Sequence, residues 1–159
     1  MQLQNSGTEL DDLAISEFEE TLLIELPEPY RNFMLQNNGG TPESELTFEF
    51  VDGDNGFTSG STVAEFLVIY PFGEISLYND IKISYDSMLE EEEISANYLP
   101  IAIDEVDNSI LISVEGEDYG KIYYANHELI DTKTGISAIN LIANSFTEFL
   151  NILKSNKQE

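Results

Sequence analysis

The sequence predicts an α+β fold in which a central, largely antiparallel sheet is flanked by helices near both ends of the chain. Three observations predict it: helical apolar spacing before residue 40, closely spaced strand patterns between residues 46 and 125, and helical spacing again after residue 136. The chain has 159 residues, of which 42% are hydrophobic, so it can bury an ample core in one domain. We therefore expect a single domain over residues 1–159.

The first helix is predicted to begin near residue 8. Thr8 can cap it, and Asp11 and Asp12 then fall in the first turn, where the helix dipole favours carboxylates. The apolar stripe expected to face the core consists of Leu10, Leu13, Phe18 and Leu22.

A second helix is predicted after Pro27. A proline disfavours helical conformation in the residue before it, and Pro29 suits a first helical turn. The face expected to be buried consists of Tyr30, Phe33 and Met34. The run NNGG at 37–40 predicts the end of this helix, because Asn and Gly accept the left-handed conformation of a C-cap.

The middle of the chain changes to the alternation typical of strands. Leu46, Phe48 and Phe50 alternate with polar residues, and a turn cluster follows at 52–56. Further strands are predicted at 65–70, 98–103, 109–114 and 121–125, and segment 76–89 is ambiguous, with a helix preferred. Short connections between the last three strands predict antiparallel hairpins, because parallel pairing needs a long crossover.

The C-terminal segment is predicted to be one helix. Its apolar positions at helical spacing are Ile136, Ile139, Ala143, Phe146, Leu150 and Leu153. Lys154 and Lys157 come at its end, where cations suit the helix dipole.

Charge narrows the class of partner. The chain has 31 acidic and 6 basic residues, a net charge of −25. Such a field repels nucleic acids and anionic membranes and attracts basic proteins; a solvated surface that only aids solubility is the alternative. The chain has no cysteine, which excludes disulfides and thiolate zinc sites, and its first residues do not resemble a signal peptide. We expect a cytoplasmic protein.

No residue pattern predicts a catalytic, metal or cofactor site. A calcium loop starting at Asp52 would lack its sixth-position Gly and twelfth-position Glu, and Gly39 and Gly40 lack a Walker lysine. His127, the only histidine, has no nucleophile or ligand motif beside it, and a structural or solvent-facing position is expected. Carboxylate pairs that could hydrolyse glycosides arise by chance among 31 acids, so a hydrolase is a remote third alternative.

Four blocks of sequence resemble the SUKH family, relatives of the fungal Smi/Knr cell-wall regulators. They are LPEPYRNF at 26–33 with NGG at 38–40, LPIAID at 99–104 with NSI at 108–110, GKIYYANHE at 120–128, and IANSFTEFL at 142–150. The motif residues, expected to be structural, are Leu26, Pro27, Tyr30, Phe33, Asn38, Gly39, Gly40, Pro100, Asp104, Asn108, Gly120, Tyr123, His127, Ser145, Phe146, Phe149 and Leu150. Two features depart from the family pattern: Asp107 stands where a Gly is usual, and the chain has no Trp.

The resemblance implies an α+β fold and a protein-binding function without catalytic residues or a cofactor. Bacterial members are commonly immunity proteins that neutralise a toxin, often a nuclease, and fungal members are regulatory scaffolds. Combined with a net charge of −25, it predicts a non-enzymatic immunity protein for a basic toxin domain. The alternative is a regulatory scaffold, which we would expect to carry disordered extensions.

Two acidic patches are candidates for partner contact, because clustered carboxylates can occupy a basic cleft by imitating phosphates. One patch is Glu90, Glu91, Glu92 and Glu93, and the other is Glu115, Glu117 and Asp118 with Tyr119. Tyr78, Tyr85 or Tyr119 would anchor an interface if exposed, and each is equally plausible as a core residue.

Overall fold

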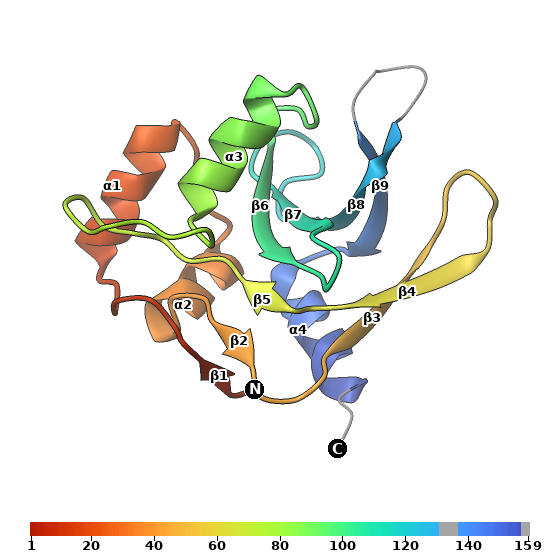
Figure 1. Cartoon of the computed structure of the whole chain (residues 1–159), viewed down its shortest axis with the longest axis horizontal. Helices are drawn as coiled ribbons and strands as arrows, with labels where there is room; N and C mark the ends of the chain where they lie inside the picture. The colour runs from red at the N-terminus through yellow and green to blue at the C-terminus, as the bar shows by residue number, and fades with distance from the viewer. Residues whose placement is uncertain (131–136, 157–159) are drawn as a thin grey trace.

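The computed structural model describes residues 1–130 and 137–156, and within these it contains four helices and nine strands (Figure 1). The helices are α1 (Asp12–Leu22), α2 (Glu28–Gln36), α3 (Ile81–Glu90) and α4 (Phe146–Ser155). The strands are β1 (Leu3–Gln4), β2 (Thr41–Pro42), β3 (Thr47–Val51), β4 (Thr58–Thr62), β5 (Glu65–Phe66), β6 (Tyr98–Ile103), β7 (Ser109–Ser113), β8 (Ile122–Ile130) and β9 (Ser137–Ala143). The predicted α+β fold is confirmed, while the extent of the domain over all of residues 1–159 stays a prediction.

A five-stranded sheet forms the centre of the fold. Its order is β5-β6-β7-β8-β9, and every neighbouring pair is antiparallel. The hairpins predicted from short connections are the pairs β6–β7 and β7–β8. Two smaller sheets pair β1 with β2 and β3 with β4. The strand predicted at 65–70 is shorter than expected: regular pairing covers only β5, and beyond it Val68 forms an isolated bridge to Asp80.

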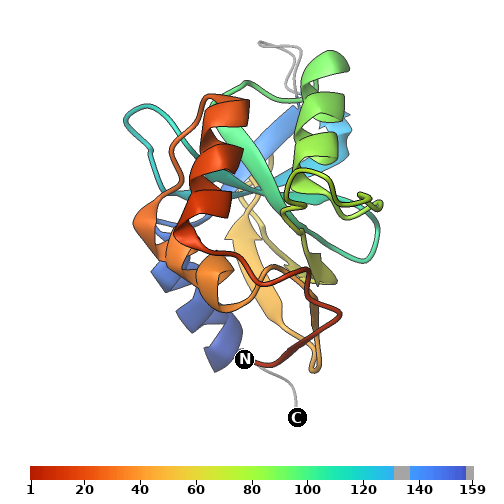
Figure 2. The same cartoon turned by 90° about the vertical axis from the view of Figure 1, so that its left-hand side faces the viewer.

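Helices cover both faces of this sheet. All five residues of β7 are buried, so neither face is open at its centre. In Figure 2 the sheet passes between α3 and α4. Helix α3 packs on β6, and α4 packs on β3, β9 and α2. The helix preferred at 76–89 is confirmed as α3, although it begins only at Ile81.

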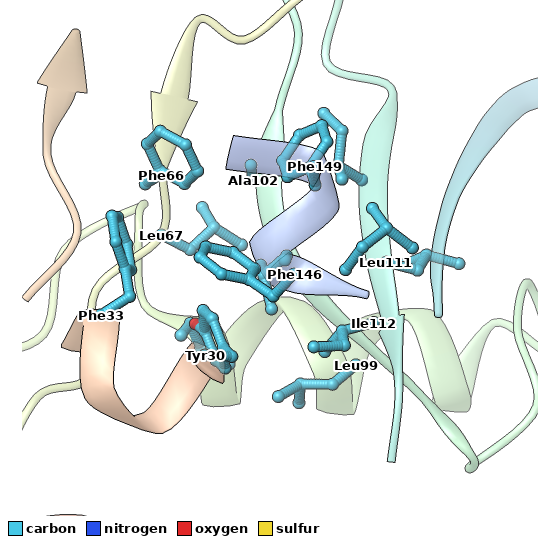
Figure 3. Close-up of a cluster of buried hydrophobic side chains, with 14 of the residues drawn as sticks. Tyr30, Phe33, Phe66, Leu67, Leu99, Ala102, Leu111, Ile112, Phe146 and Phe149 are labelled. Carbon is cyan, nitrogen blue, oxygen red and sulfur yellow. The ribbon is translucent and has the colours of Figure 1, made fainter. Parts of the chain in front are cut away.

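An aromatic cluster joins α2 to α4 in the core (Figure 3). The ring of Phe146 lies 5.1 Å from that of Tyr30 and 5.0 Å from that of Phe33, measured between centroids. Tilted aromatic pairs of this kind each contribute about 0.5–1.5 kcal/mol beyond their buried area. The predicted buried face of α2, which also contains Met34, is confirmed.

Helix α1 begins later than predicted and turns a different face to the core. Asp11 is its N-cap, whereas the Thr8 hydroxyl donates a hydrogen bond of 2.6 Å to the Glu74 carboxylate. Leu13, predicted to be buried, is exposed, and Ile15 is buried in its place. Ile15, Phe18 and Leu22 recur at spacings of three and four residues and share one face of the helix, whereas Leu13 lies five residues before Phe18 and falls on another face.

The C-terminal segment is a strand followed by a helix, so the prediction of one helix is wrong. Residues Ser137–Ala143 form β9, which pairs with β8, and α4 starts only after Ser145. The Ser145 hydroxyl accepts the Glu148 N–H at 3.0 Å and caps α4. The apolar spacing of this segment fits a helix, and pairing with a neighbouring strand decided against it. Two predicted positions, Ile136 and Lys157, lie outside the described residues.

The predicted end of α2 is confirmed, and it also connects distant segments. The helix ends at Gln36, but its C-cap Asn37 is extended and not left-handed as expected, and the positive φ of +66° comes at Gly39. A Cβ atom on Gly39 would collide with the carbonyl oxygen of Leu67. The buried Asn38 side chain donates to the Ile69 carbonyl at 2.8 Å and accepts the Ile69 N–H at 2.9 Å. Asn38 therefore provides backbone-like pairing where the strand after β5 becomes irregular.

Candidate partner-binding groove

A groove of about 910 Å³ opens between the C-terminal end of α1, the start of α2 and the loop that joins β7 to β8. These segments can be followed in Figure 2. Part of its lining is apolar, from Ile24, Leu26 and Val114. Its acidic lining consists of Glu19, Glu20, Glu25, Glu28 and Glu115. We call this feature the acidic groove.

Glu19 and Arg31, which both line the acidic groove, form hydrogen bonds and ion pairs within the fold. Glu19 accepts the Leu26 N–H at 2.7 Å and lies 3.6 Å from the Arg31 guanidinium. Arg31 also binds the Asp12 carboxylate at 2.5 Å, and this hydrogen bond raises the pKa of Arg31 despite the opposing effect of burial. Arg31 therefore stays charged and joins α2 to α1.

The other four glutamates of the acidic groove are exposed and uncompensated. Glu20, Glu25, Glu28 and Glu115 all face solvent. Within residues 1–130 and 137–156, no lysine or arginine lies within ion-pair distance of any of them. A cation that entered the groove would gain their attraction without first displacing another partner.

Two of the four residues of the predicted patch in the β7–β8 loop line one wall of the acidic groove. Glu115 and Tyr119 line it, and Glu117 lies exposed in the same loop. The Tyr119 hydroxyl donates a 3.0 Å hydrogen bond to the Glu25 carbonyl oxygen, which lies on the opposite wall. This bond fixes the two walls relative to each other, so the groove is preformed.

Asp118, the fourth residue predicted in that patch, has its carboxylate turned toward neighbouring hydroxyls. It accepts hydrogen bonds from Ser113 at 2.8 Å, Tyr98 at 3.0 Å and Tyr123 at 2.8 Å. Burial alone would raise the pKa of Asp118, but these hydroxyl groups lower it. Its direct contact with a partner stays a prediction, and the observed bonds give it a role in shaping the loop.

Leu23 is the unexpected residue of the acidic groove. It is the C-cap of α1, with φ 57° and ψ 45°, and its N–H donates to the carbonyls of Glu19 and Glu20. This left-handed conformation costs a non-glycine residue roughly 1–2 kcal/mol. Its side chain is 91% exposed, so no packing offsets that cost in the free protein. The groove therefore combines uncompensated charge with an exposed apolar side chain.

The second predicted patch, Glu90 to Glu93, lies at the C-terminal end of α3, and none of its members lines the acidic groove. Glutamates at this end of a helix are opposed by the helix dipole. Burial, followed by hydrogen bonding with Glu91, raises the pKa of Glu93, and the charge of nearby His127 partly opposes this shift. The two patches are separate features of the surface.

The three tyrosines considered as anchors differ in exposure. Tyr78 and Tyr119 are exposed. Tyr85 is buried in α3, and its hydroxyl bonds to the Ala96 carbonyl. Tyr85 is therefore a core residue and is not available as an anchor.

The family-motif residue Asp104 organises the turn between β6 and β7. Its carboxylate accepts the N–H groups of Val106 at 3.0 Å and Asn108 at 2.9 Å, the Ser61 hydroxyl at 2.9 Å and the Tyr124 hydroxyl at 2.5 Å. Burial would raise the pKa of Asp104, but these hydrogen bonds lower it. Burial and the bond to this carboxylate raise the pKa of Tyr124 to about 12. These hydrogen bonds hold the β6–β7 turn and connect it to β4 and β8.

That the other motif residues have a structural function stays a prediction. His127 is exposed, and its backbone N–H donates to the Asn108 side chain at 3.1 Å. Within the described ranges, no group of three metal-binding side chains comes together, and no helix is long and apolar enough to cross a membrane.

The sequence singled out Glu115 and Tyr119 as candidates for partner contact, and both line the acidic groove, but it did not single out the residues of the opposite wall. Glu20, Leu23, Glu25 and Glu28 come from the α1–α2 connection, which was interpreted only as a helix boundary. One signal was present: the apolar run LLI at 22–24 continues beyond what one helix face can bury and has glutamates on both sides.

Comparison with known protein families matches residues 9–152 to the SMI1/KNR4 family (SUKH-1). None of the curated proteins compared with the chain matches it. The matched range contains all four motif blocks, both walls of the acidic groove and the Asp104 turn. The chain belongs to the SMI1/KNR4 family (SUKH-1).

Proposed function

We propose that this protein is an immunity protein that binds a toxin domain with a basic active face, of the nuclease class, and neutralises it. The observation that carries the proposal is the acidic groove, whose lining combines an exposed leucine with four exposed glutamates that form no ion pair within the described part of the chain. Family membership and a net charge of −25 support it.

The proposed mechanism is occlusion. A nuclease must present positive charge to the phosphates of its substrate, and carboxylates held at the groove can take the place of those phosphates. The field of the whole chain speeds the encounter, by about 10- to 1000-fold at low salt. No covalent step is needed, because a toxin whose cleft is filled cannot reach nucleic acid.

Charge alone gives little residence time, so the groove also needs anchors. Charged side chains at an interface rim mainly affect the association rate, whereas buried apolar and aromatic residues dominate the binding energy. Leu23 and Tyr119 both border the acidic groove, and we assign this anchoring function to them.

The test measures affinity for the purified toxin domain encoded beside the chain's own gene. The groove variant is Glu20→Gln/Glu25→Gln/Glu28→Gln. The control is Glu45→Gln/Glu49→Gln/Glu105→Gln, which removes the same charge from exposed positions that do not line the groove. We expect the groove variant to lose at least tenfold in affinity, about 1.4 kcal/mol, and the control to change less than about threefold.

Two results would contradict the proposal. Equal losses in the two variants would mean that only net charge matters and that the groove is not the contact site. Failure of the wild-type chain to bind the toxin domain or to rescue cells that express it would reject the immunity function. Co-purification with several unrelated cellular proteins would then favour a regulatory scaffold.

A further inference from the structure

The connection between β5 and α3 presents apolar side chains to solvent. Four residues in the segment at 71–78 are exposed: Phe72, Ile75, Leu77 and Tyr78. Phe72 is 101% exposed and Ile75 is 87% exposed, so neither touches the core. We call this segment the apolar loop. A single exposed apolar residue needs no explanation, but four within seven positions indicate an interaction site.

Hydrogen bonds hold the apolar loop in place. The Glu74 carboxylate accepts the Thr8 hydroxyl at 2.6 Å, and the Glu74 N–H donates to the Pro71 carbonyl at 3.1 Å. At the other end, the Tyr78 hydroxyl donates to the buried Glu65 carboxylate at 3.0 Å. The loop therefore presents its side chains from a fixed backbone, which reduces the ordering cost of binding.

A small hollow lies directly beside the apolar loop. It has a volume of about 180 Å³ and is bounded by α1, by residues 69–72 and by the start of α3. Phe72 forms part of its edge, and Ala14, Phe18 and Ile69 contribute apolar lining. A partner can thus receive the exposed Phe72 ring and insert a side chain of its own beside it.

The apolar loop and the β7–β8 loop, which contributes one wall of the acidic groove, lie on either side of α1 (Figure 2). The hollow beside the loop is lined by Ala14, Glu17, Phe18 and Thr21, whereas the acidic groove is lined by Ser16, Glu19, Glu20 and Leu23. These sets are two stripes along the same short helix. One partner domain that straddles α1 would contact both surfaces.

The net charge of the chain argues against two possible partners for the apolar loop. Two copies of a chain with net charge −25 repel each other, and an anionic membrane is repelled in the same way. We infer that the apolar loop docks into an apolar cleft on the same basic toxin domain that covers the acidic groove. This inference rests on the proposed function and assigns the second half of that interface.

The test uses the same purified toxin domain and compares two double variants. Phe72→Ser/Ile75→Ser removes the loop's two most exposed apolar side chains. Phe57→Ser/Val106→Ser is the control, because Phe57 and Val106 are also apolar, exposed and located in turns, but distant in sequence from the loop. We expect at least a tenfold loss of affinity for the loop variant and less than a twofold change for the control. The slope of affinity against salt should stay unchanged in the loop variant, because no charge is removed.

The outcomes separate the inference from the proposed function. If the toxin domain fails to bind the wild-type chain, both are wrong. If the groove variant weakens binding but the loop variant does not, the inference alone is wrong. If the loop variant instead abolishes self-association in sedimentation, or abolishes binding to phosphatidylcholine vesicles, while toxin binding persists, the loop has another occupant and the inference is overturned.

Discussion

Leu23 occupies a backbone conformation for which glycine is the usual residue at a helix C-terminus. Its exposed side chain contributes little packing to the folded chain. Residues that are locally unfavourable for stability concentrate at functional sites, so this strain agrees with an anchoring function.

We predict that Leu23→Gly raises stability and lowers affinity for the toxin domain. Removing the left-handed strain should add about 1 kcal/mol to the free energy of unfolding, partly offset by the greater freedom of the unfolded chain. Urea denaturation measures the first effect, and titration with the toxin domain measures the second. If Leu23→Gly is more stable but binds the toxin domain as tightly as the wild type, Leu23 is not part of the interface.

The buried side chain of Tyr30 contains a polar group that is unfavourable for folding stability. Its hydroxyl is buried without a hydrogen-bond partner among the described residues, and burial raises its pKa. We predict that Tyr30→Phe leaves the unfolding free energy unchanged or raises it by about 1 kcal/mol, because an unsatisfied polar group is removed. Tyr124→Phe is the matched control, since that hydroxyl bonds to Asp104 and Asn108, and it should cost roughly 1–3 kcal/mol. Destabilisation of similar size in both variants would show that Tyr30 has a partner after all.

Among the elements, the β6–β7 turn is the one whose stability should depend most clearly on pH. The pKa of Asp104 is lower in the folded chain than its ordinary value of about 3.9. A depressed carboxyl pKa stabilises the fold above that ordinary value, and the contribution disappears as pH falls through the folded pKa.

We therefore predict that Asp104→Asn destabilises the protein at pH 7 by roughly 1–3 kcal/mol and that the difference from wild type shrinks below about pH 4. Urea denaturation of both proteins at several pH values measures it. The surface variant Glu105→Gln, one position along the chain, should follow the wild type at every pH. A difference for Asp104→Asn that persists unchanged at pH 3 would assign the effect to packing.

Elements with strong local signals were predicted well from sequence, and those that depend on distant partners were not. The hairpins β6–β7–β8 follow from short connections, and the end of α2 follows from its Asn-Gly run. Segment Ser137–Ala143 was assigned to a helix because its apolar spacing fits one, and only β8 makes it a strand.

The same limit applies to the candidate site. Glu115 and Tyr119, which line the β7–β8 wall of the acidic groove, were singled out because they belong to one short acidic loop in the sequence. The opposite wall was missed because its residues are far from this loop in the sequence. Glu25, which accepts the hydrogen bond from Tyr119, lies 94 positions before it. Exposure, which singles out Leu23 and Phe72, cannot be read from residue type.

At the scale of the whole molecule, a net charge of −25 makes the folded chain repel itself. Raising NaCl from about 20 mM to about 500 mM shortens the screening length from roughly 20 Å to roughly 4 Å. We predict that the melting temperature rises over this range at pH 7. Scanning calorimetry or fluorescence at each concentration measures it.

The control is the same salt series near pH 4, where many carboxyl groups are protonated and the repulsion is smaller. The salt effect should be much reduced there. An equal rise at both pH values would point to salting-out of apolar surface in place of screening.

The placement of exposed side chains around α1 separates what holds the fold together from what selects a partner. Ile15 and Phe18 are buried and pack α1 on the core. The residues proposed to contact a toxin are exposed and lie at the C-terminal end of α1, at the start of α2 and in the β7–β8 and apolar loops. Substitutions at Glu20, Glu28 or Ile75 leave the buried aromatic cluster untouched. If the proposed function holds, related chains can therefore change the toxin that they bind by substitutions at the surface alone, as antibodies do with their loops, while the buried scaffold stays the same.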